Sequence, residues 1–405
     1  MIRFEIKKVF SRTRSKTAAL LLVIVLLAVS MLTISRVEYV DESGNHRTGM
    51  GAAGKLREEK NVWAGYLTGD VFRSVYQENS RINGEYSSGS AEGSTEAENR
   101  MFQEKQGISS IADVINLANS PWREYDYYAI DNITEDEAAK VYEKRISGLE
   151  EWFASGEEDF PEAQQAFLLD QYKSLDTPFY YEYFDGWGAL LKNISTFMMI
   201  LALFIGFFVS GIFSDEFQLR ADAVFLSAKL GRSRAVLAKI AAGLLMATAL
   251  FAAFIFAYTF IVLFVLGAGG AGSPIQLEMW RDFYNATFLE TYLLIVLGGY
   301  VGTMFAVSAA MLVSAITRST VIAIMAPFVV LCVLPFLSRI ITLPAICSFF
   351  PDRLMDIYNA VQDFSLLEIG GKVVGLPPVL ILVYAIAVFA LQPVIYGVCR
   401  RVEVR

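Results

Sequence analysis

Cysteine and histidine are scarce in this 405-residue chain, which contains three cysteines and one histidine. The cysteines, Cys332, Cys347 and Cys399, all lie outside the long polar segment 36–187, which excludes a disulfide scaffold there. A zinc site of the usual kind draws on several Cys and His ligands. Because His46 stands alone, we predict no metal site.

A complete phosphate-binding loop is also missing. Residues 49–55, Gly-Met-Gly-Ala-Ala-Gly-Lys, match the spacing of such a loop as far as its lysine. Leu56 then stands where the motif requires the Ser or Thr that binds Mg²⁺, and no strand is predicted before the segment. We interpret the match as chance and expect no nucleotide site in this chain.

Long apolar runs are abundant. Apolar residues make up 55% of the chain, and the mean hydropathy is +0.44. A helix needs about 20 largely apolar residues to cross the hydrocarbon core of a bilayer. The runs that meet this requirement are 17–34, 190–213, 236–266, 288–316, 320–337 and 377–398. They predict an all-α polytopic membrane protein with about six transmembrane helices. The first helix, 17–35, follows a basic start, but it lacks a clear cleavage site, so we expect an uncleaved anchor.

Charge is distributed unevenly along the chain. The formal net charge is −8, yet segment 36–187 holds 14 Lys and Arg against 30 Asp and Glu, a net charge of −16. The short segments 1–16, 214–239 and 399–405 contain six, five and three Lys or Arg. By the positive-inside rule these basic segments and both termini are cytoplasmic, and segment 36–187 is extracytoplasmic.

Segment 36–187 is too long for a connection and has the usual size of a domain, so we expect a mainly helical extracytoplasmic domain. Helices are predicted after the capping-box pair Thr134 and Glu137 and over 161–175, 55–79 and 110–118. Residues 83–99 are predicted to form a loop. The aromatic run 178–187 is typical of the headgroup level of a membrane, and a wall that contacts a ligand is the alternative.

The first 16 residues predict an amphipathic helix. Ile2, Ile6, Val9 and Phe10 share one helical face, and basic residues occupy the others. Such a helix suits the surface of an anionic inner leaflet. The alternative is a set of ordinary basic flanking residues that fix the topology. We favour a cytoplasmic interfacial helix over residues 1–16.

A second amphipathic helix is predicted over residues 214–231, between the second and third runs. Phe217 and Phe225 lie on its apolar face, and Glu216 precedes Arg220 by four residues, the favourable order for a helical ion pair.

Gly231 is suited to end this helix, and Ser233 is suited to cap the next one. Force applied to the helix would therefore move the following span. The predicted helix is either the element on which a motor domain acts or a segment that fills the gap between two spans. The residues alone favour neither interpretation.

This segment resembles the coupling region of the ABC-2 type permease family, in the bacterial branch with a large extracytoplasmic domain between the first two spans. The matching residues are Glu216, the stretch 224–228, Ser233, Arg234 and Lys239. The family commonly has Gly-Thr and a Pro in this motif. Here the corresponding residues are Ala221, Asp222, Leu230 and Gly231.

The resemblance implies the permease subunit of an ABC exporter in the bacterial cell membrane, with no enzyme activity of its own. A second permease subunit, identical or related, and cytosolic ATPase subunits that bind ATP and Mg would complete the transporter. The cargo would be amphipathic or hydrophobic: a peptide, an antimicrobial, a drug or a lipid-like molecule. The residues to which we assign ATPase coupling are Asp215, Glu216, Phe217, Arg220, Phe225, Ser233, Arg234 and Lys239.

Two features of the remaining membrane part, 188–405, carry expectations. Gly298, Gly299 and Gly302 suit close helix packing in lipid, where small residues let backbones approach. Residues 339–375 are too polar for a clean span and predict short external or re-entrant helices.

A membrane sensor or scaffold is the alternative function. Its acidic outer domain would attract a cationic peptide without transporting it. Against this reading, the longest predicted cytoplasmic segment is about 25 residues and contains no signalling domain. A secondary transporter is disfavoured because the spans carry almost no charge and no internal repeat is detectable. We expect no nucleic-acid partner.

Overall fold

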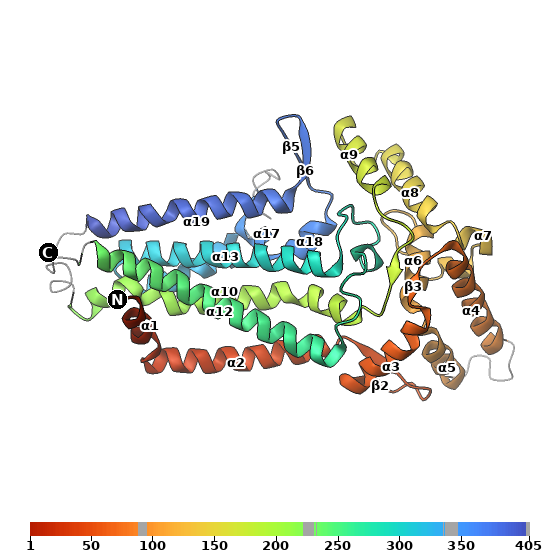
Figure 1. The fold of residues 1–405 in the computed structure, drawn as a ribbon, viewed down its shortest axis with the longest axis horizontal. Coiled ribbons are helices and arrows are strands. Elements are labelled where there is room, and N and C mark those ends of the chain that lie inside the picture. Colours follow the sequence, from red (N-terminus) through yellow and green to blue (C-terminus); the bar gives the residue numbers. More distant parts are fainter. Residues whose placement is uncertain (88–94, 222–230, 232, 335, 337–346, 402–405) are drawn as a thin grey trace.

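The computed structural model describes residues 1–405 apart from 88–94, 222–230, 232, 335, 337–346 and 402–405. Figure 1 shows a bundle of long helices with a group of shorter elements at one end. We call this group, residues 36–184, the head. Helix α1 and the C-terminal end of α19 lie at the opposite end of the bundle, which we call the base.

The bundle is built from apolar helices. Their bounds are α2 (Thr13–Ile34), α10 (Asp185–Gln218), α12 (Arg234–Leu266), α13 (Phe288–Thr317), α14 (Thr320–Phe328) with the π turn η4 (Val329–Val333), and α19 (Leu376–Arg400). All except α14 are long and apolar enough to cross a membrane, which makes five candidate spans among the described residues. The helical, multi-pass character predicted from the sequence is confirmed to this extent. The fifth predicted run, 320–337, is a shorter apolar helix over Thr320–Val333, and part of the run lies outside the described residues.

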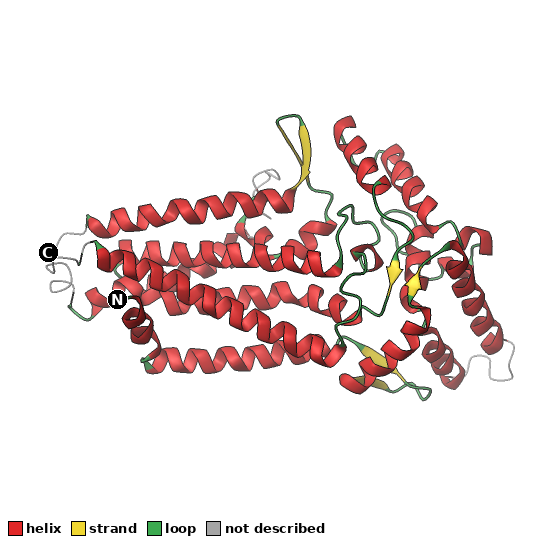
Figure 2. Ribbon diagram, viewed as in Figure 1, coloured by secondary structure: helices red, strands yellow, loops and turns green. Residues whose placement is uncertain are grey.

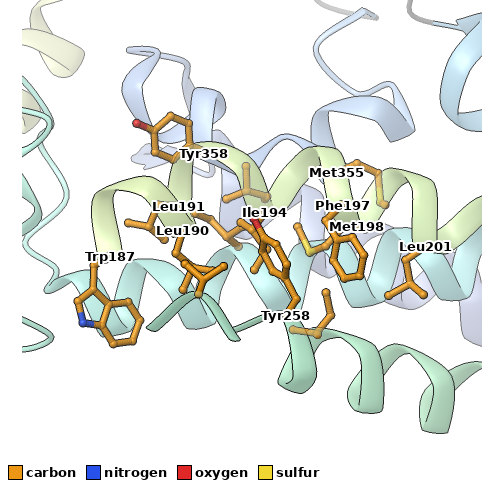
Figure 3. Packing of buried hydrophobic residues seen from close by; sticks show 14 of the residues in the cluster. Trp187, Leu190, Leu191, Ile194, Phe197, Met198, Leu201, Tyr258, Met355 and Tyr358 are labelled. Atoms are coloured by element: carbon orange, nitrogen blue, oxygen red, sulfur yellow. The ribbon is translucent and has the colours of Figure 1, made fainter. Parts of the chain in front are cut away.

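Helices α10 and α13 form the centre of the bundle. Within their most apolar windows 67% and 61% of the residues are buried, against 28% in α2 and α12 and 17% in α19. Figure 3 shows apolar side chains of α10 packed against their neighbours, and the ring of Phe197 stacks on that of Tyr258 with centroids 4.7 Å apart. The peripheral helices expose apolar side chains outward, as expected for a surface that faces lipid.

The three glycines of α13 lie at close helix contacts. A Cβ on Gly298 would come within 2.6 Å of Ile357, and one on Gly302 would come within 2.6 Å of the Met355 sulfur. A Cβ on Gly299 would collide with Met198 of α10. The absent side chains thus let α13 approach α10 and the short helices α17 (Pro351–Met355) and α18 (Ile357–Gln362).

The head combines short helices with small antiparallel strand pairs (Figure 2). Its elements are β1 (Glu38–Val40), β2 (His46–Thr48), α3 (Met50–Lys60), η1 (Asn61–Trp63), β3 (Gly65–Tyr66), α4 (Gly69–Ser87), α5 (Thr95–Lys105), α6 (Ser109–Asn119), η2 (Ala129–Asp131), α7 (Glu135–Ala138), α8 (Val141–Ser155), α9 (Glu162–Lys173) and β4 (Tyr180–Tyr181). The mainly helical domain predicted from the sequence is present, and the capping box of Thr134 and Glu137 is formed.

Two local predictions for the head are wrong. The single helix expected over 55–79 is divided, because η1 and β3 interrupt it and β3 pairs with the distant strand β4. Gly65, at φ 140°, adopts a backbone conformation that no helix contains. The loop expected over 83–99 is partly helical, since α4 continues to Ser87 and α5 begins at Thr95, with 88–94 outside the described residues.

The aromatic run 178–187 is the joint between head and bundle rather than an exposed interfacial belt. Phe179, Tyr181, Tyr183 and Phe184 are at most 4% exposed. The alternation of β4 points Tyr180 outward and Tyr181 inward, and the buried rings pack beneath the head. The prediction failed because hydropathy cannot distinguish rings that face lipid headgroups from rings that fill a protein joint.

Two short helices lie in the described part of segment 339–375, whose residues 339–346 are outside the described residues. They are α17 (Pro351–Met355) and α18 (Ile357–Gln362), and a hairpin of β5 (Leu366–Ile369) and β6 (Lys372–Gly375) leads into α19. Gly370 and Gly371 both have positive φ at the hairpin tip. A Gly-Gly pair between two short apolar runs is a strong hairpin signal, and the sequence reading missed it.

Candidate functional site

Helix α1 (Ile2–Phe10) docks its apolar face on the base of the bundle. Val9 is buried, and the ring of Phe10 lies 5.5 Å from that of Phe208 in α10. The predicted amphipathic helix is present, but its apolar residues contact α10 and α12 instead of facing lipid. This placement brings the basic residues of α1 beside the end of α10.

The carboxylate of Glu216, in the last turn of α10, forms ion pairs with two ammonium groups. Its Oε1 lies 2.7 Å from Lys8 Nζ and 2.8 Å from Lys239 Nζ. Lys239 of α12 is 1% exposed and also donates to Glu5 Oε2 at 3.0 Å and to the Ile212 carbonyl at 2.9 Å. One carboxylate therefore joins α1, α10 and α12.

Asp215 adds a second connection to the N-terminal segment. Its Oδ2 lies 2.5 Å from Arg12 and its Oδ1 lies 3.2 Å from Arg14, at the turn between α1 and α2. Gly211, one turn earlier, leaves room for this carboxylate, because a Cβ there would stand 2.7 Å from Asp215 Oδ2. Asp215 is 5% exposed, so its charge is satisfied within the protein.

Hydroxyl groups extend the connections to α13 and α14. Ser214 Oγ lies 2.7 Å from Thr320 Oγ1, and Ser314 Oγ donates to the Ser210 carbonyl at 2.6 Å. Thr320 Oγ1 in turn donates to Gln218 Oε1 at 3.2 Å. The final turns of α10 are therefore hydrogen-bonded to α13 and α14 as well as ion-paired with α1 and α12.

Together these groups form what we call the basal network. Its charged members are Glu5, Asp215, Glu216, Lys8, Arg12, Arg14 and Lys239. Buried charges lose hydration, and this loss is offset only when partners stand in good geometry. The ion pairs of the network thus form when the ends of α1, α10 and α12 keep one relative arrangement, and displacement of any one of them separates charges.

The predicted coupling residues divide into buried and exposed groups. Asp215, Glu216 and Lys239 belong to the basal network and offer little surface to a partner. Phe217 contacts the Arg318 guanidinium, whose Cζ lies 4.8 Å from the ring centroid. Arg234 is exposed at the first turn of α12.

Three details of the predicted coupling segment differ from expectation. Residues 214–218 continue α10, so no separate helix begins at 214, and 222–230, with Phe225, lie outside the described residues. The expected ion pair of Glu216 with Arg220 is wrong. Glu216 faces Lys8 and Lys239, while Arg220, at φ 54°, follows the helix end. Ser233 occupies the N-cap position of α12 without a side-chain hydrogen bond.

Sequence reasoning missed the contribution of Glu5, Lys8, Arg12 and Arg14. A signal was present: the predicted cytoplasmic segments contain many basic residues and few acidic ones, among them Glu5, Asp215 and Glu216. Charges of opposite sign at the same membrane face are candidates for pairing even when 200 residues separate them.

The described residues contain no group of three or more His, Cys, Asp or Glu that could hold a metal ion. His46 is exposed and lies 2.6 Å from Glu38 across the β1–β2 pair. The segment that resembles a phosphate-binding loop forms the start of α3. Comparisons of the chain with protein-family models, with curated proteins and with solved structures found no match.

Proposed function

We propose that this chain is the permease subunit of an ABC exporter, with its base in the bacterial cytoplasm and its head outside. The observation that carries the proposal is the basal network. It ties the last turn of α10 to α1 and α12, beside the segment that resembles a coupling helix. A motor that displaced this segment would act on several membrane helices together.

In the proposed mechanism, ATP-driven closure of separate ATPase subunits pushes the chain between Gln218 and Arg234. This connection follows α10 and precedes α12 directly. Arg220 and Arg234 are exposed and available to a partner. Glu216 and Lys239 act within the protein, where they transmit the displacement. The cargo is an amphipathic or hydrophobic peptide, antimicrobial, drug or lipid-like molecule, and a second permease subunit completes the path.

The distribution of charge supports the proposed orientation. The basic segment 1–16 and the C-terminal end of α19 at Arg400 lie at the base, on the far side of the bundle from the head, whose net charge is −15. Lys and Arg are retained on the cytoplasmic side of membrane proteins.

Reconstitution of the chain with an ABC ATPase that co-purifies with it tests the proposal. Lys8→Gln and Glu216→Gln each weaken the basal network while preserving side-chain size. We expect cargo-stimulated ATP turnover and transport to fall by roughly tenfold, while the ATPase still co-purifies, because a charged hydrogen bond contributes about 1.5 kcal/mol. The matched control is Lys140→Gln, an exposed head residue. Unchanged turnover in both network variants would make the coupling role wrong.

A sensor or scaffold is the second candidate function, favoured by the head charge of −15. Such a protein would bind a cationic peptide through the head without moving it. The same proteoliposomes distinguish the two functions. ATP-dependent accumulation of cargo on the head side supports export, whereas peptide binding with no ATP-dependent movement and no ATPase partner supports the sensor.

A further inference from the structure

A cavity of about 660 Å³ lies where the head meets the bundle. Its wall combines residues that follow α2, residues of α3 and α5, and the first turns of α10. Helix α2 has 22 residues, which gives a length of about 33 Å at 1.5 Å per residue, close to the hydrocarbon thickness of about 30 Å. Arg36, two residues beyond its end, therefore stands at the headgroup level of a bilayer.

Two cations on the cavity wall stand outside the salt bridges of the described residues. Arg36 is exposed and Lys105 is half-buried, and within the described residues neither side chain forms a salt bridge or hydrogen bond. Burial lowers the pKa of the Lys105 ammonium, opposed by the more distant charge of Asp131. A half-buried ammonium without a partner loses hydration and gains from any anion that reaches it.

Most of the other charges around the cavity are paired. Lys60 is 7% exposed and holds both Asp185 oxygens at 2.7 and 2.8 Å. Lys192 pairs with Glu278. Glu38 lies 2.6 Å from His46, which is a hydrogen bond and cancels no charge while His46 is neutral. Arg36 and Lys105 together therefore outweigh Glu38 and leave the cavity with a local positive charge within a head that is strongly acidic overall.

A neighbouring cavity of about 490 Å³ shares six lining residues with the first, including Lys60 and Glu278. It contains Asp113, whose carboxylate accepts a hydrogen bond from the Tyr125 hydroxyl at 2.7 Å. Burial raises the pKa of Asp113. Asp113 lines this second cavity and not the first one, where Arg36 and Lys105 stand.

The remaining wall is largely apolar. Val37, Leu56 and Ala189 are buried beside the cavity, and Phe102 is 48% exposed. An apolar surface beside two unpaired cations matches a ligand with an apolar body and an acidic head. A free anion in solution would meet the repulsive field of the head, whereas an amphiphile in the bilayer reaches the cavity at the headgroup level.

We propose that this cavity binds the phosphate or carboxylate headgroup of an anionic membrane amphiphile, held by Arg36 and Lys105. The inference goes beyond the proposed transport function, because it concerns binding at the head end and requires neither an ATPase nor movement of cargo. Both cations donate charge-assisted hydrogen bonds, and the guanidinium suits two oxygens of one headgroup.

The test uses the full-length chain in a neutral detergent, titrated with phosphatidylglycerol and with phosphatidylcholine, with bound lipid counted by native mass spectrometry. We expect phosphatidylglycerol to bind at least about tenfold more tightly. Arg36→Gln and Lys105→Gln should each weaken its binding by about tenfold, which corresponds to about 1.4 kcal/mol. Arg100→Gln, an exposed cation also on α5 that does not line the cavity, should leave the affinity unchanged.

Three outcomes would overturn the inference. The first is equal affinity for the two lipids, which needs no variant and is independent of folding. The second is an equal loss in Arg100→Gln and in the two cavity variants, which indicates general surface charge. The third is displacement of phosphatidylglycerol by an equal concentration of glycerol phosphate, which indicates a soluble anion as the ligand.

Discussion

At the scale of single residues, Lys239 offers a direct test of the basal network. Replacement by Met removes the ammonium shared by Glu216 and Glu5, which leaves the buried Glu216 carboxylate with Lys8 alone. Breaking a buried ion pair from one side costs about 3–5 kcal/mol. We expect Lys239→Met to lower the unfolding temperature of the purified chain clearly, whereas Arg234→Met, exposed on the same helix, has little effect.

The double variant Lys239→Met with Glu216→Leu shows whether the two side chains act together. An apolar pair of similar volume often replaces a buried ion pair at little cost. The double variant should therefore unfold at a higher temperature than Lys239→Met alone. Additive losses from the two substitutions would mean that the pair is not coupled.

Asp282 gives a prediction about pH. It lies in the connection between α12 and α13, it is 2% exposed, and burial raises the pKa of its carboxyl to about 7 despite the nearby Arg145 guanidinium. The pKa of this carboxyl in the unfolded chain is about 3.9. Between that pH and about pH 7, Asp282 is protonated in the folded state and ionised in the unfolded state, so the free energy of unfolding falls as the pH rises through this window.

Asp282→Asn removes this penalty. The variant should be more stable than the wild type at about pH 8.5, on the order of 2 kcal/mol, and the difference should disappear near pH 4 because each pKa unit corresponds to about 1.4 kcal/mol. Thermal unfolding of both proteins across this range is the measurement. Other buried carboxyls contribute equally to the stability of the wild type and of the variant, so the difference in stability between the two proteins reports on Asp282. A difference that does not change with pH would contradict the raised pKa of Asp282.

The residues of the candidate site were predictable in part. Asp215, Glu216 and Lys239 follow from the pattern of the coupling segment, whereas their partners Lys8 and Arg12 do not. A sequence shows which charges share a membrane face, but pairing across 200 residues depends on how helices pack. The same limit explains why the sequence predicted an ion pair of Glu216 with Arg220, since Arg220 is the basic residue one helical turn after it.

At the scale of elements, hydropathy located the helices of the bundle but not their ends. The apolar run 190–213 predicts a span, and α10 extends beyond it on both sides, from Asp185 to Gln218. Hydropathy measures the part that suits lipid, while backbone hydrogen bonding continues into polar residues. In the head, the pairing of β3 with β4 overrides the helical pattern of 55–79, because strand partners distant in sequence leave no periodic signal.

The contact between α10 and α14 depends on a glycine. A Cβ on Gly206 would collide with the ring of Pro327, which cannot rotate away. We expect Gly206→Ala to destabilise the chain by about 1–3 kcal/mol despite the better helix propensity of alanine. Gly397→Ala in α19 is the control, since no atom lies within 4 Å of its added Cβ. Thermal unfolding compares them, and equal behaviour of the two variants would contradict a tight contact at Gly206.

At the scale of the whole molecule, the head is attached to the bundle by buried polar contacts. Arg145 of α8 donates to the Trp280 carbonyl at 3.2 Å and to the Asp282 carbonyl at 2.6 Å, and its guanidinium lies 3.8 Å from the Tyr172 ring centroid. Lys60 joins α3 to the start of α10. In the proposed transport cycle, movement of the bundle would therefore carry the head with it.

Orientation in the membrane is the prediction on which the transport direction depends. A Ser43→Cys variant places a thiol on the exposed β1–β2 turn of the head, and an Arg234→Cys variant places one at the base, in a background without the three native cysteines. Because the basic segments gather at the base, we expect a membrane-impermeant maleimide added to intact cells to label the head thiol, and the base thiol only after permeabilisation. The reverse labelling pattern would place the acidic head in the cytoplasm. Export driven from the base would then be impossible, because the ATPase subunits would have no access to the segment between α10 and α12.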